Sequence, residues 1–433
     1  MFLKYFRISV ACVIAHAAKP LARCFLLVLA LLPAAAFAEA SALTLEEATQ
    51  LAVDRAPLLA ARSAGVAAAE QDAARAGALP DPMLVFGIEN LPITGADSFD
   101  FSADEMTMKR IGVRQDIPAR AKREARSNFA VRKIDEARAL SESAKLDVRR
   151  VAALAWIDVW AAQTELAALE ALRAQAASAA ELAAARVAGG VEPVADALAT
   201  EVAVLEVDNR IESVRARCAV AQAGLSRWLG DASVQTTAEA PQFNLLRVPE
   251  ARLVANVDRL SPLLPASAQV ATAAANIELA RAEKRIDWSV GASYGQRQGG
   301  RSDMLSIEFG ISLPFFPDDR QDRAVSAREA DHVAAVATRE DLRREAIASI
   351  RADIARWDGL KRQVALHEDK MLPLARDRSA TALASYRAGG DVQSWLNAQR
   401  DELDVHLSHA QHIGELGRAW AGLAYLLPLE ERS

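Results

Sequence analysis

Two long stretches without proline limit the folds that this chain can adopt. One runs from Ala119 to Val187 and the other from Arg323 to Leu372, and both follow helical periodicity. A helix of about 65 residues would be about 100 Å long, at about 1.5 Å per residue. Aromatic residues make up only 5% of the chain, which favours long helices with narrow apolar seams over a large globular core.

Small and apolar residues along these stretches predict that the helices pair as coiled coils. One seam alternates spacings of three and four and comprises Val204, Val207, Ile211, Val214, Cys218, Ala221 and Leu225. A second seam has smaller residues, which permit close approach: Leu169, Leu172, Ala176, Ala179 and Ala183. Cys218 is interpreted as a small apolar knob.

The sequence also contains an internal repeat. The triplets Ala188-Gly189-Gly190 and Ala388-Gly389-Gly390 lie 200 residues apart, and each interrupts a long helical stretch. We interpret them as the turns of two antiparallel helical hairpins. Residues of about 43–230 and 250–430 are then two copies of one unit, built from a helix, a pair of strands and a helical pair.

Four short segments alternate with a period of two, which is typical of strands with one apolar and one polar face. They lie near 83–90, 106–116, 288–296 and 304–313. The clearest is the last, in which Ile307 and Phe309 flank Glu308. The segment 106–116 is less regular, because Lys109 and Arg110 are adjacent, and its phase could slip.

Two interpretations of these strands remain open. In one, a four-stranded sheet packs on the helices and turns its polar face to water. In the other, the strands cross a membrane, for which about ten tilted residues suffice. Four strands cannot close a barrel, and the smallest barrels have about eight, so the second interpretation requires oligomerisation. With three copies, the second interpretation gives twelve strands. The family resemblance described below implies the corresponding fold, which is mainly α with membrane β: a trimeric 12-stranded β-barrel, four strands per chain, continued by a long α-helical coiled-coil barrel.

The first 38 residues are predicted to be a secretory signal peptide. A basic start precedes the apolar run Phe25–Ala34 and the site Ala36-Phe37-Ala38. The alternative, a membrane anchor, is disfavoured because about 14 apolar residues are too few to span comfortably. Cleavage at Ala38–Glu39 would leave 39–433, change the net charge from −6 to −10 and leave Cys218 as the one cysteine. No basic stripe remains for nucleic acid, and no later stretch is apolar enough for a transmembrane helix.

Several segments carry a resemblance to a known family. They are Leu79-Pro80-Asp81-Pro82-Met83, Asn90-Leu91-Pro92, Gln115-Asp116-Ile117-Pro118 ahead of Lys122-Arg123, Leu313-Pro314-Phe315-Phe316 and Tyr386-Arg387-Ala388-Gly389. In this order they resemble TolC-type outer-membrane efflux factors, most closely the CzcC-like branch found with heavy-metal exporters. The resemblance implies a homotrimer in the lipid of the cell outer membrane with a large periplasmic portion. It also implies a periplasmic adaptor (a membrane-fusion protein) and an inner-membrane pump of the RND type as partners.

The resemblance suggests two kinds of site near the turns. Adaptors dock on the helical tips in this family, so Gly189, Gly190, Gly389 and Gly390 are docking candidates, although tight turns alone also explain these glycines. Family members often narrow the tunnel with carboxylates after the second tip. Ser394 and Asn397 match those positions here, so the acidic ring is absent, and Tyr386 and Asp391 are the remaining constriction candidates.

Three histidines form a weaker candidate site. His406, His409 and His412 are three residues apart on a predicted helix, with Glu402 one turn before, and such neighbours can share a cation. A solvated helix face is the favoured alternative. The loop Ile93–Glu105 is acidic and could tune cation passage, although a solvated loop is the default interpretation.

The resemblance implies a passive exit duct without catalysis, and we expect neither an enzyme nor a cofactor. No nucleophile constellation, phosphate-binding loop or zinc-ligand spacing is present. The predicted function is the outer-membrane exit duct of a tripartite efflux system that conducts heavy-metal cations. One alternative is a duct for drugs, small organics or secreted proteins. Another is a periplasmic coiled-coil scaffold without a pore.

Overall fold

The computed structural model describes residues 42–230, 236, 239–313 and 315–428, so the predicted signal peptide lies outside the described residues. The first half contains α1 (Leu45–Arg55), α2 (Pro57–Ala76), β1 (Met83–Glu89), β2 (Met108–Ile117), α3 (Arg120–Ala188) and α4 (Val194–Leu229). The second half contains α5 (Glu250–Ala255), the 3-10 turn η1 (Val257–Arg259), α6 (Leu263–Ala282), β3 (Trp288–Arg297), β4 (Met304–Ile311), α7 (Gln321–Leu366), the π turn η2 (His367–Met371), α8 (Leu372–Arg387) and α9 (Val392–Ala424).

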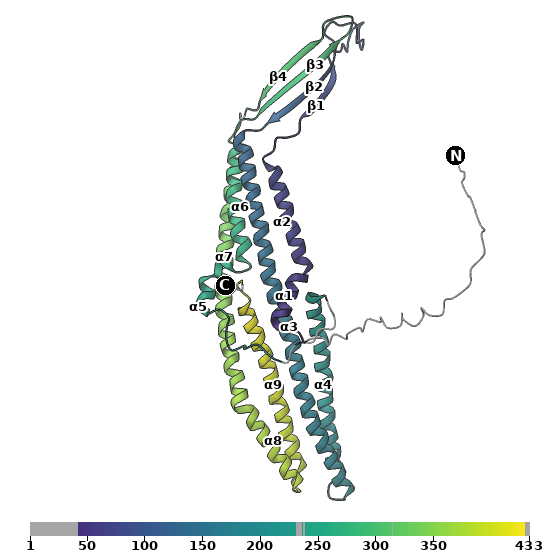
Figure 1. Cartoon of the computed structure of the whole chain (residues 1–433), viewed down its shortest axis with the longest axis vertical. Helices are drawn as coiled ribbons and strands as arrows, with labels where there is room; N and C mark the ends of the chain where they lie inside the picture. The colour runs from purple at the N-terminus through teal and green to yellow at the C-terminus, as the bar shows by residue number, and fades with distance from the viewer. Residues whose placement is uncertain (1–41, 231–235, 237–238, 314, 429–433) are drawn as a thin grey trace, which may run out of the picture. The chain divides into compact units, whose positions relative to one another are not determined.

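The described part of 42–428 is mostly helical, with one four-stranded antiparallel sheet, as predicted. The strands lie beyond one end of the helices, and the α3/α4 and α8/α9 turns lie at the opposite end (Figure 1). α3 has 69 residues, which confirms the first predicted rod. The strand ends differ from the predicted ones by one or two residues.

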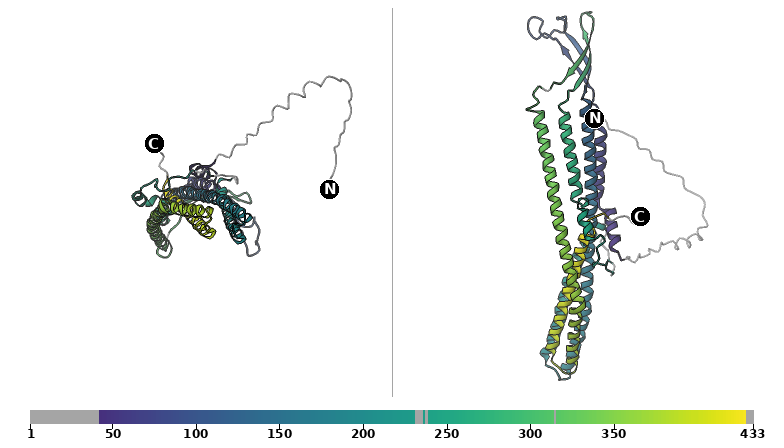
Figure 2. Two further views of the ribbon diagram at one scale, coloured as in Figure 1. Left: turned by 90° about the horizontal axis from the view of Figure 1, so that it is seen from below. Right: turned by 90° about the vertical axis from the view of Figure 1, so that its left-hand side faces the viewer.

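The helices next to the sheet form a layer rather than a closed bundle. α2 packs on α3, α3 on α6 and α6 on α7, and the helices follow an open arc when viewed from below (Figure 2, left). α2 contributes no buried residue. α2 is in contact with α3, and among the described residues no other helix or strand packs extensively on it.

The coiled-coil seams occur where the spacing predicts them. All five predicted positions on α3 are buried, and so are Val207, Ile211, Val214, Cys218 and Leu225 on α4. Val204 and Ala221 are half-buried. Cys218 packs with leucine and valine side chains, as expected of a small apolar knob.

The largest core lies at the middle of the helices, where three tryptophans are anchored by the chain that wraps around them. Trp156 Nε1 donates to the Leu43 carbonyl at 2.8 Å. Trp357 Nε1 donates to Phe243 O at 2.8 Å, and Trp420 Nε1 to Leu245 O at 2.7 Å. Each indole thus buries its ring and satisfies its one donor, which fixes the loop around 239–249 against the helices.

The second predicted rod departs from a regular α-helix. Residues 321–387 stay helical throughout, but His367–Met371 form a π turn in which the Leu372 N–H reaches the His367 carbonyl. Pro373 follows immediately and cannot donate a backbone hydrogen bond. A π turn adds one residue locally and lets the helix continue through the proline. The sequence prediction ended this stretch at Leu372 and missed both features.

No helix within the described residues is long and apolar enough to cross a membrane.

Candidate functional site

The sheet separates its side chains into two chemically different faces. The strands follow the order β1-β2-β3-β4 with unbroken antiparallel registers. Cross-strand partners place the apolar side chains on one face: Leu84, Phe86, Ile88, Ile111, Val113, Ile117, Trp288, Val290, Ala292, Tyr294, Leu305, Ile307, Phe309 and Ile311. Many are well exposed, including Phe86 at 79% and Phe309 at 73%. This contiguous apolar face is far larger than isolated surface residues would give.

The anticipated slip in β2 does not occur. Lys109 lies on the apolar face at the loop end of the sheet, paired with Ile88 and Gln296. Arg110 lies on the polar face, where its guanidinium contacts both Glu89 of β1 and Glu308 of β4. Its Nε also donates to Ser293 Oγ at 2.7 Å. Arg110 therefore links all four strands across the polar face.

Glycines let this polar face curl tightly. A Cβ at Gly112 would lie 2.5 Å from the Ser293 Cβ, and one at Gly310 would lie 2.3 Å from the Ser289 Oγ. Both distances are shorter than real contacts, so neither position accepts a larger side chain without movement. The polar face is thus the crowded side of the sheet and the apolar face the open side.

The sheet has two unpaired edges within the described residues. β1 pairs only with β2, and β4 pairs only with β3. An exposed edge presents a row of backbone donors and acceptors that a further strand can pair with. The chain therefore carries a two-faced sheet that is open at both sides.

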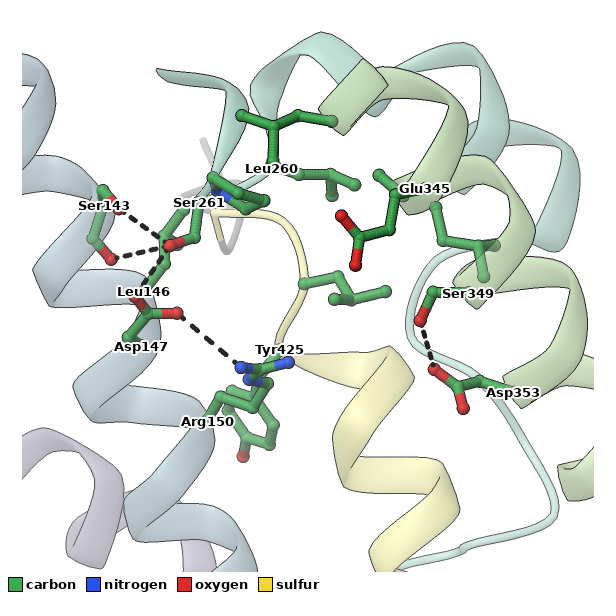
Figure 3. Close-up of a pocket in the computed structure, with 15 residues that line it drawn as sticks. Ser143, Leu146, Asp147, Arg150, Leu260, Ser261, Glu345, Ser349, Asp353 and Tyr425 are labelled. Atoms are coloured by element: carbon green, nitrogen blue, oxygen red, sulfur yellow. Dashed lines mark hydrogen bonds and ion pairs between the residues drawn. The ribbon is translucent and has the colours of Figure 1, made fainter. Parts of the chain in front are cut away.

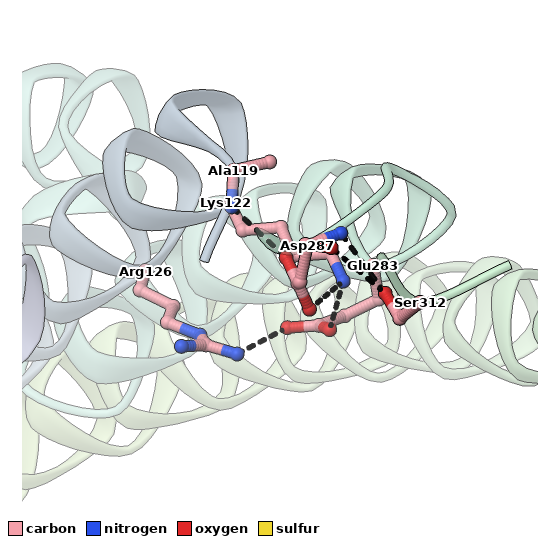
Figure 4. Close-up of polar contacts among 6 residues, drawn as sticks. All are labelled: Ala119, Lys122, Arg126, Glu283, Asp287 and Ser312. Carbon is pink, nitrogen blue, oxygen red and sulfur yellow. Dashed lines mark hydrogen bonds and ion pairs between the residues drawn. The ribbon is translucent and has the colours of Figure 1, made fainter. Parts of the chain in front are cut away.

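An ionic contact holds the start of the sheet to the helices (Figure 4). Lys122 of α3 is 5% exposed, and its Nζ lies 2.7 Å from Asp287 and 3.5 Å from Glu283. Asp287 also accepts the Ala119 N–H at 2.9 Å, and its own N–H donates to Ser312 Oγ at 2.9 Å. Burial acts to raise the pKa of Asp287, but the hydrogen bonds from Lys122 and Ala119 outweigh it and hold this pKa below its usual range.

The four predicted glycines lie in the two turns at the helical tips, and the two turns need glycine at different positions. Gly190 has φ +70° and Gly389 φ +101°, conformations that favour glycine. A Cβ at Gly390 would lie 2.9 Å from the Ser385 carbonyl, whereas one at Gly189 would have ordinary contacts at 3.6 Å. Three of the four glycines are thus needed for the turns. The turns alone do not explain Gly189, and docking at all four stays a prediction.

Tyr386 ties the two hairpins together at the tips. Its side chain is 0% exposed, and its Oη donates to Glu192 Oε2 at 2.7 Å. Arg186 Nε lies 3.0 Å from the same carboxylate, and its guanidinium lies 4.7 Å from the Tyr386 ring centre. Trp395 stacks on the other side, with ring centres 6.1 Å apart. Burial, followed by the contact with Glu192, raises the pKa of Tyr386 to about 12.

Asp391, the other constriction candidate, caps α9. Its carboxylate accepts the backbone N–H groups of Gln393 at 3.1 Å and Ser394 at 2.9 Å. These hydrogen bonds lower the pKa of Asp391. The sequence indicated Tyr386 and Asp391 as candidates, but the contacts of Tyr386 with Arg186 and Glu192 were not predicted, because these residues are about 200 positions away along the chain.

The three predicted histidines do not lie on a solvated face. His406 and His409 have side chains 16% exposed, and His367 of η2, which the sequence analysis missed, is packed against His409 and His412. Within the described residues, no group of three or more His, Cys, Asp or Glu side chains is arranged to hold a metal ion. Metal transit at these histidines stays a prediction.

A cavity of about 430 Å³ lies between α3, α7 and the chain around Ser261 (Figure 3). Ser261 Oγ donates to Asp147 at 2.8 Å and lies 2.8 Å from Ser143 Oγ, while Ser349 donates to Asp353 at 3.3 Å. These polar groups bond to one another, and the lining contains no histidine, cysteine or lysine.

Solved structures with the same fold are known. A membrane protein from Pseudomonas aeruginosa superposes with a TM-score of 0.75 at 17% identity, covering 89% of this chain and 93% of its own. CusC gives 0.74 at 14% identity, covering 89% and 92%. The outer membrane protein VceC from Vibrio cholerae gives 0.70 at 16% identity, covering 88% and 95%. No curated protein sequence matches the chain.

The model of the family described as "Outer membrane efflux protein" matches residues 48–231 and 259–427, which include both helical hairpins and all four strands. The chain belongs to the outer membrane efflux protein family.

Proposed function

We propose that three copies of this chain form a passive exit duct whose sheets close into a 12-stranded barrel in the outer membrane. The observation that carries the proposal is the sheet, which exposes one apolar face across all four strands and has two unpaired edges. Lipid would cover the apolar face, and neighbouring copies would pair the edges, since strands in a membrane must leave no edge open. The polar face with Arg110, Glu89 and Glu308 would line a wet lumen.

The helices support the same closure. α2 is an edge helix without buried residues. Near the tip, α4 exposes a stripe at coiled-coil spacing whose members are Val194, Leu198, Val202 and Leu205, exposed by 49–64%. Such a stripe fits the seam of another helix. A neighbouring copy would therefore cover the chain along the helices as well as along the sheet.

Membrane fractionation separates this proposal from a coiled-coil scaffold without a pore. The duct requires detergent for extraction and, once reconstituted, conducts ions across a planar bilayer. A scaffold is released as soluble protein when the cells are opened and gives no conductance. Release of the mature chain in soluble form, with its sheet folded, would overturn the barrel.

The tips are proposed to dock a periplasmic adaptor that connects the duct to an inner-membrane pump of the RND type. Gly189 is the suitable probe, because the turn geometry does not depend on it. Replacing Gly189 with a bulky residue should reduce adaptor crosslinking while leaving the amount of assembled duct unchanged. Crosslinking and efflux that both stay at the wild-type level would count against docking at this position.

Heavy-metal cations are the proposed substrate. The support is the resemblance to the CzcC-like branch and the acidic loop, in which Asp97, Asp100, Asp104 and Glu105 follow strand β1. The alternative is a duct for drugs or small organics. A deletion strain should become sensitive to zinc, cobalt, cadmium or copper and not to a panel of antibiotics; the opposite pattern would favour the alternative.

A further inference from the structure

Four of the six histidines in the chain gather where α9 meets the π turn. The His367 ring of η2 stacks on His409 with ring centres 5.9 Å apart, and it tilts against His412 at 5.0 Å. His406 lies one turn before His409 on the same helix. His367 is itself only 6% exposed. The cluster therefore forms much of the contact between α9 and the irregular point of the α7–α8 rod.

The hydrogen bonds of the cluster are those of neutral rings. The Nδ1 atoms of His367, His409 and His412 are all buried without a hydrogen-bond partner. His367 is bonded to the backbone of Val405, which must therefore involve its other nitrogen. A proton added at any of the three Nδ1 atoms would be a buried donor without an acceptor, next to another imidazole, and such a group is costly.

The charged groups around the cluster do not compensate for several added protons. Glu402 lies 3.9 Å from His406, and Glu368 of η2 lies 3.9 Å from His409, so these two carboxylates favour protonation. Arg376 of α8 opposes it at His406. η2 itself also carries Asp369 and Lys370. Other charges on the elements that pack on α9 form ion pairs: Lys361–Asp358 on α7, Glu165–Arg217 between α3 and α4, Arg210–Asp404 between α4 and α9, and Arg418–Asp158 between α9 and α3.

The cluster lies where the hydrogen bonding of the α7–α8 rod is interrupted. η2 and Pro373 interrupt the regular hydrogen bonding of the rod directly above α8, and the α8/α9 hairpin below carries one of the two tips. A π turn is a point at which a helix can change direction. Contacts at this level therefore act together with the Tyr386–Glu192 contact at the tips in holding the hairpin below.

We propose that the imidazole cluster of His367, His406, His409 and His412 is an acid-sensitive joint: the neutral rings hold α9 against the π turn, and protonation of His367, His406 and His409 releases the α8/α9 hairpin at this level. This role goes beyond conduction and concerns a change in the position of one hairpin within one chain.

The direction of the pH dependence follows from the histidine pKa values. Burial, and then the neighbouring rings, lower the pKa of His409 to about 4, and burial also lowers the pKa values of His367 and His406. In a released hairpin these three rings would titrate near about 6.5. Because the held form binds fewer protons, the contact is complete above about pH 6.5 and weakens as the pH falls toward about 4.

Distance measurements between spin labels test the joint directly. Labels at Leu374 of α8 and Gln411 of α9, both exposed, would be introduced into the full chain with Cys218→Ala, and labelled chains would be diluted with unlabelled ones in detergent. We expect one distance at pH 7.5 and a second, longer component whose population rises about tenfold by pH 4.5. An unchanged distribution over this range in the chain with all its histidines would overturn the proposal.

Two variants show which histidines are responsible. His367→Gln with His409→Gln replaces two rings by amides that do not titrate and should remove most of the pH response. His332→Gln, on α7 and away from the cluster, is the matched control and should keep the response. A response that persists in the double variant would contradict the proposal. The distance lies within one chain, so the result does not depend on whether the chain forms a trimer or a pore.

Discussion

At the scale of single residues, the two diglycine turns look alike in sequence but differ in backbone conformation. In the first turn the second glycine has a positive φ, and in the second turn the first glycine does: Gly190 at +70° and Gly389 at +101°. The sequence repeat predicted both turns. It could not predict that Gly190, Gly389 and Gly390 are needed for the turns and Gly189 is not, because that depends on how each chain reversal is completed.

Alanine substitutions should separate these glycines. Gly190→Ala and Gly389→Ala force a side chain into a strained conformation and should each lower the unfolding free energy by about 1–2 kcal/mol. Gly189→Ala has room and normal dihedrals and should change it by less than about 0.5 kcal/mol. Urea unfolding of the helical part, followed by circular dichroism, measures all three. Equal losses at Gly189 and Gly190 would refute the assignment.

Tyr386→Phe tests the contact between the two hairpins. The change removes the donor to Glu192, and a hydrogen bond to a charged group contributes about 1.5–3 kcal/mol. Because the pKa of Tyr386 is raised to about 12, its contribution is complete below about pH 10 and is lost as the pH rises through about 12. The difference in urea midpoint between wild type and variant should therefore be smaller at pH 11 than at pH 8. No difference at either pH would show that Tyr386 acts through packing alone.

At the scale of elements, the period-two pattern correctly predicted which side chains share a face of the sheet. It predicted less well for β2, where Lys109 and Arg110 are adjacent and the register stays regular nevertheless. Arg110 meets Glu89 and Glu308 from other strands, and no local pattern reports such pairs. Tyr386 and Glu192 are likewise 194 residues apart. Contacts between residues so far apart along the chain could not be predicted from local sequence patterns.

Lysine substitutions at two adjacent positions of β4 test which face meets lipid. Ile307 lies on the apolar face and Ser306 on the polar face of the same strand. A lysine on the lipid face near the bilayer midplane costs about 2–4 kcal/mol, whereas a lumen position tolerates it. Ile307→Lys should therefore reduce the amount of assembled protein in outer-membrane fractions, and Ser306→Lys should not. Equal losses, or the reverse order, would argue for a water-facing sheet.

At the scale of the whole molecule, surfaces without a partner among the described residues occur in the sheet, in the helices next to it and near the helical tip. The sheet ends in two open edges, α2 buries none of its residues, and α4 exposes an apolar stripe near the tip. The helices themselves form an arc and not a closed bundle (Figure 2). Closure by further copies would cover all of these surfaces at once, which one chain cannot do.

The number of chains per particle tests this account most directly. Native mass spectrometry of the mature protein, extracted in detergent and then released from its micelle, counts the chains without reference to transport. The account predicts particles of three chains, which supply the 12 strands of a closed barrel. A stable single chain, or an even number of chains, would contradict it.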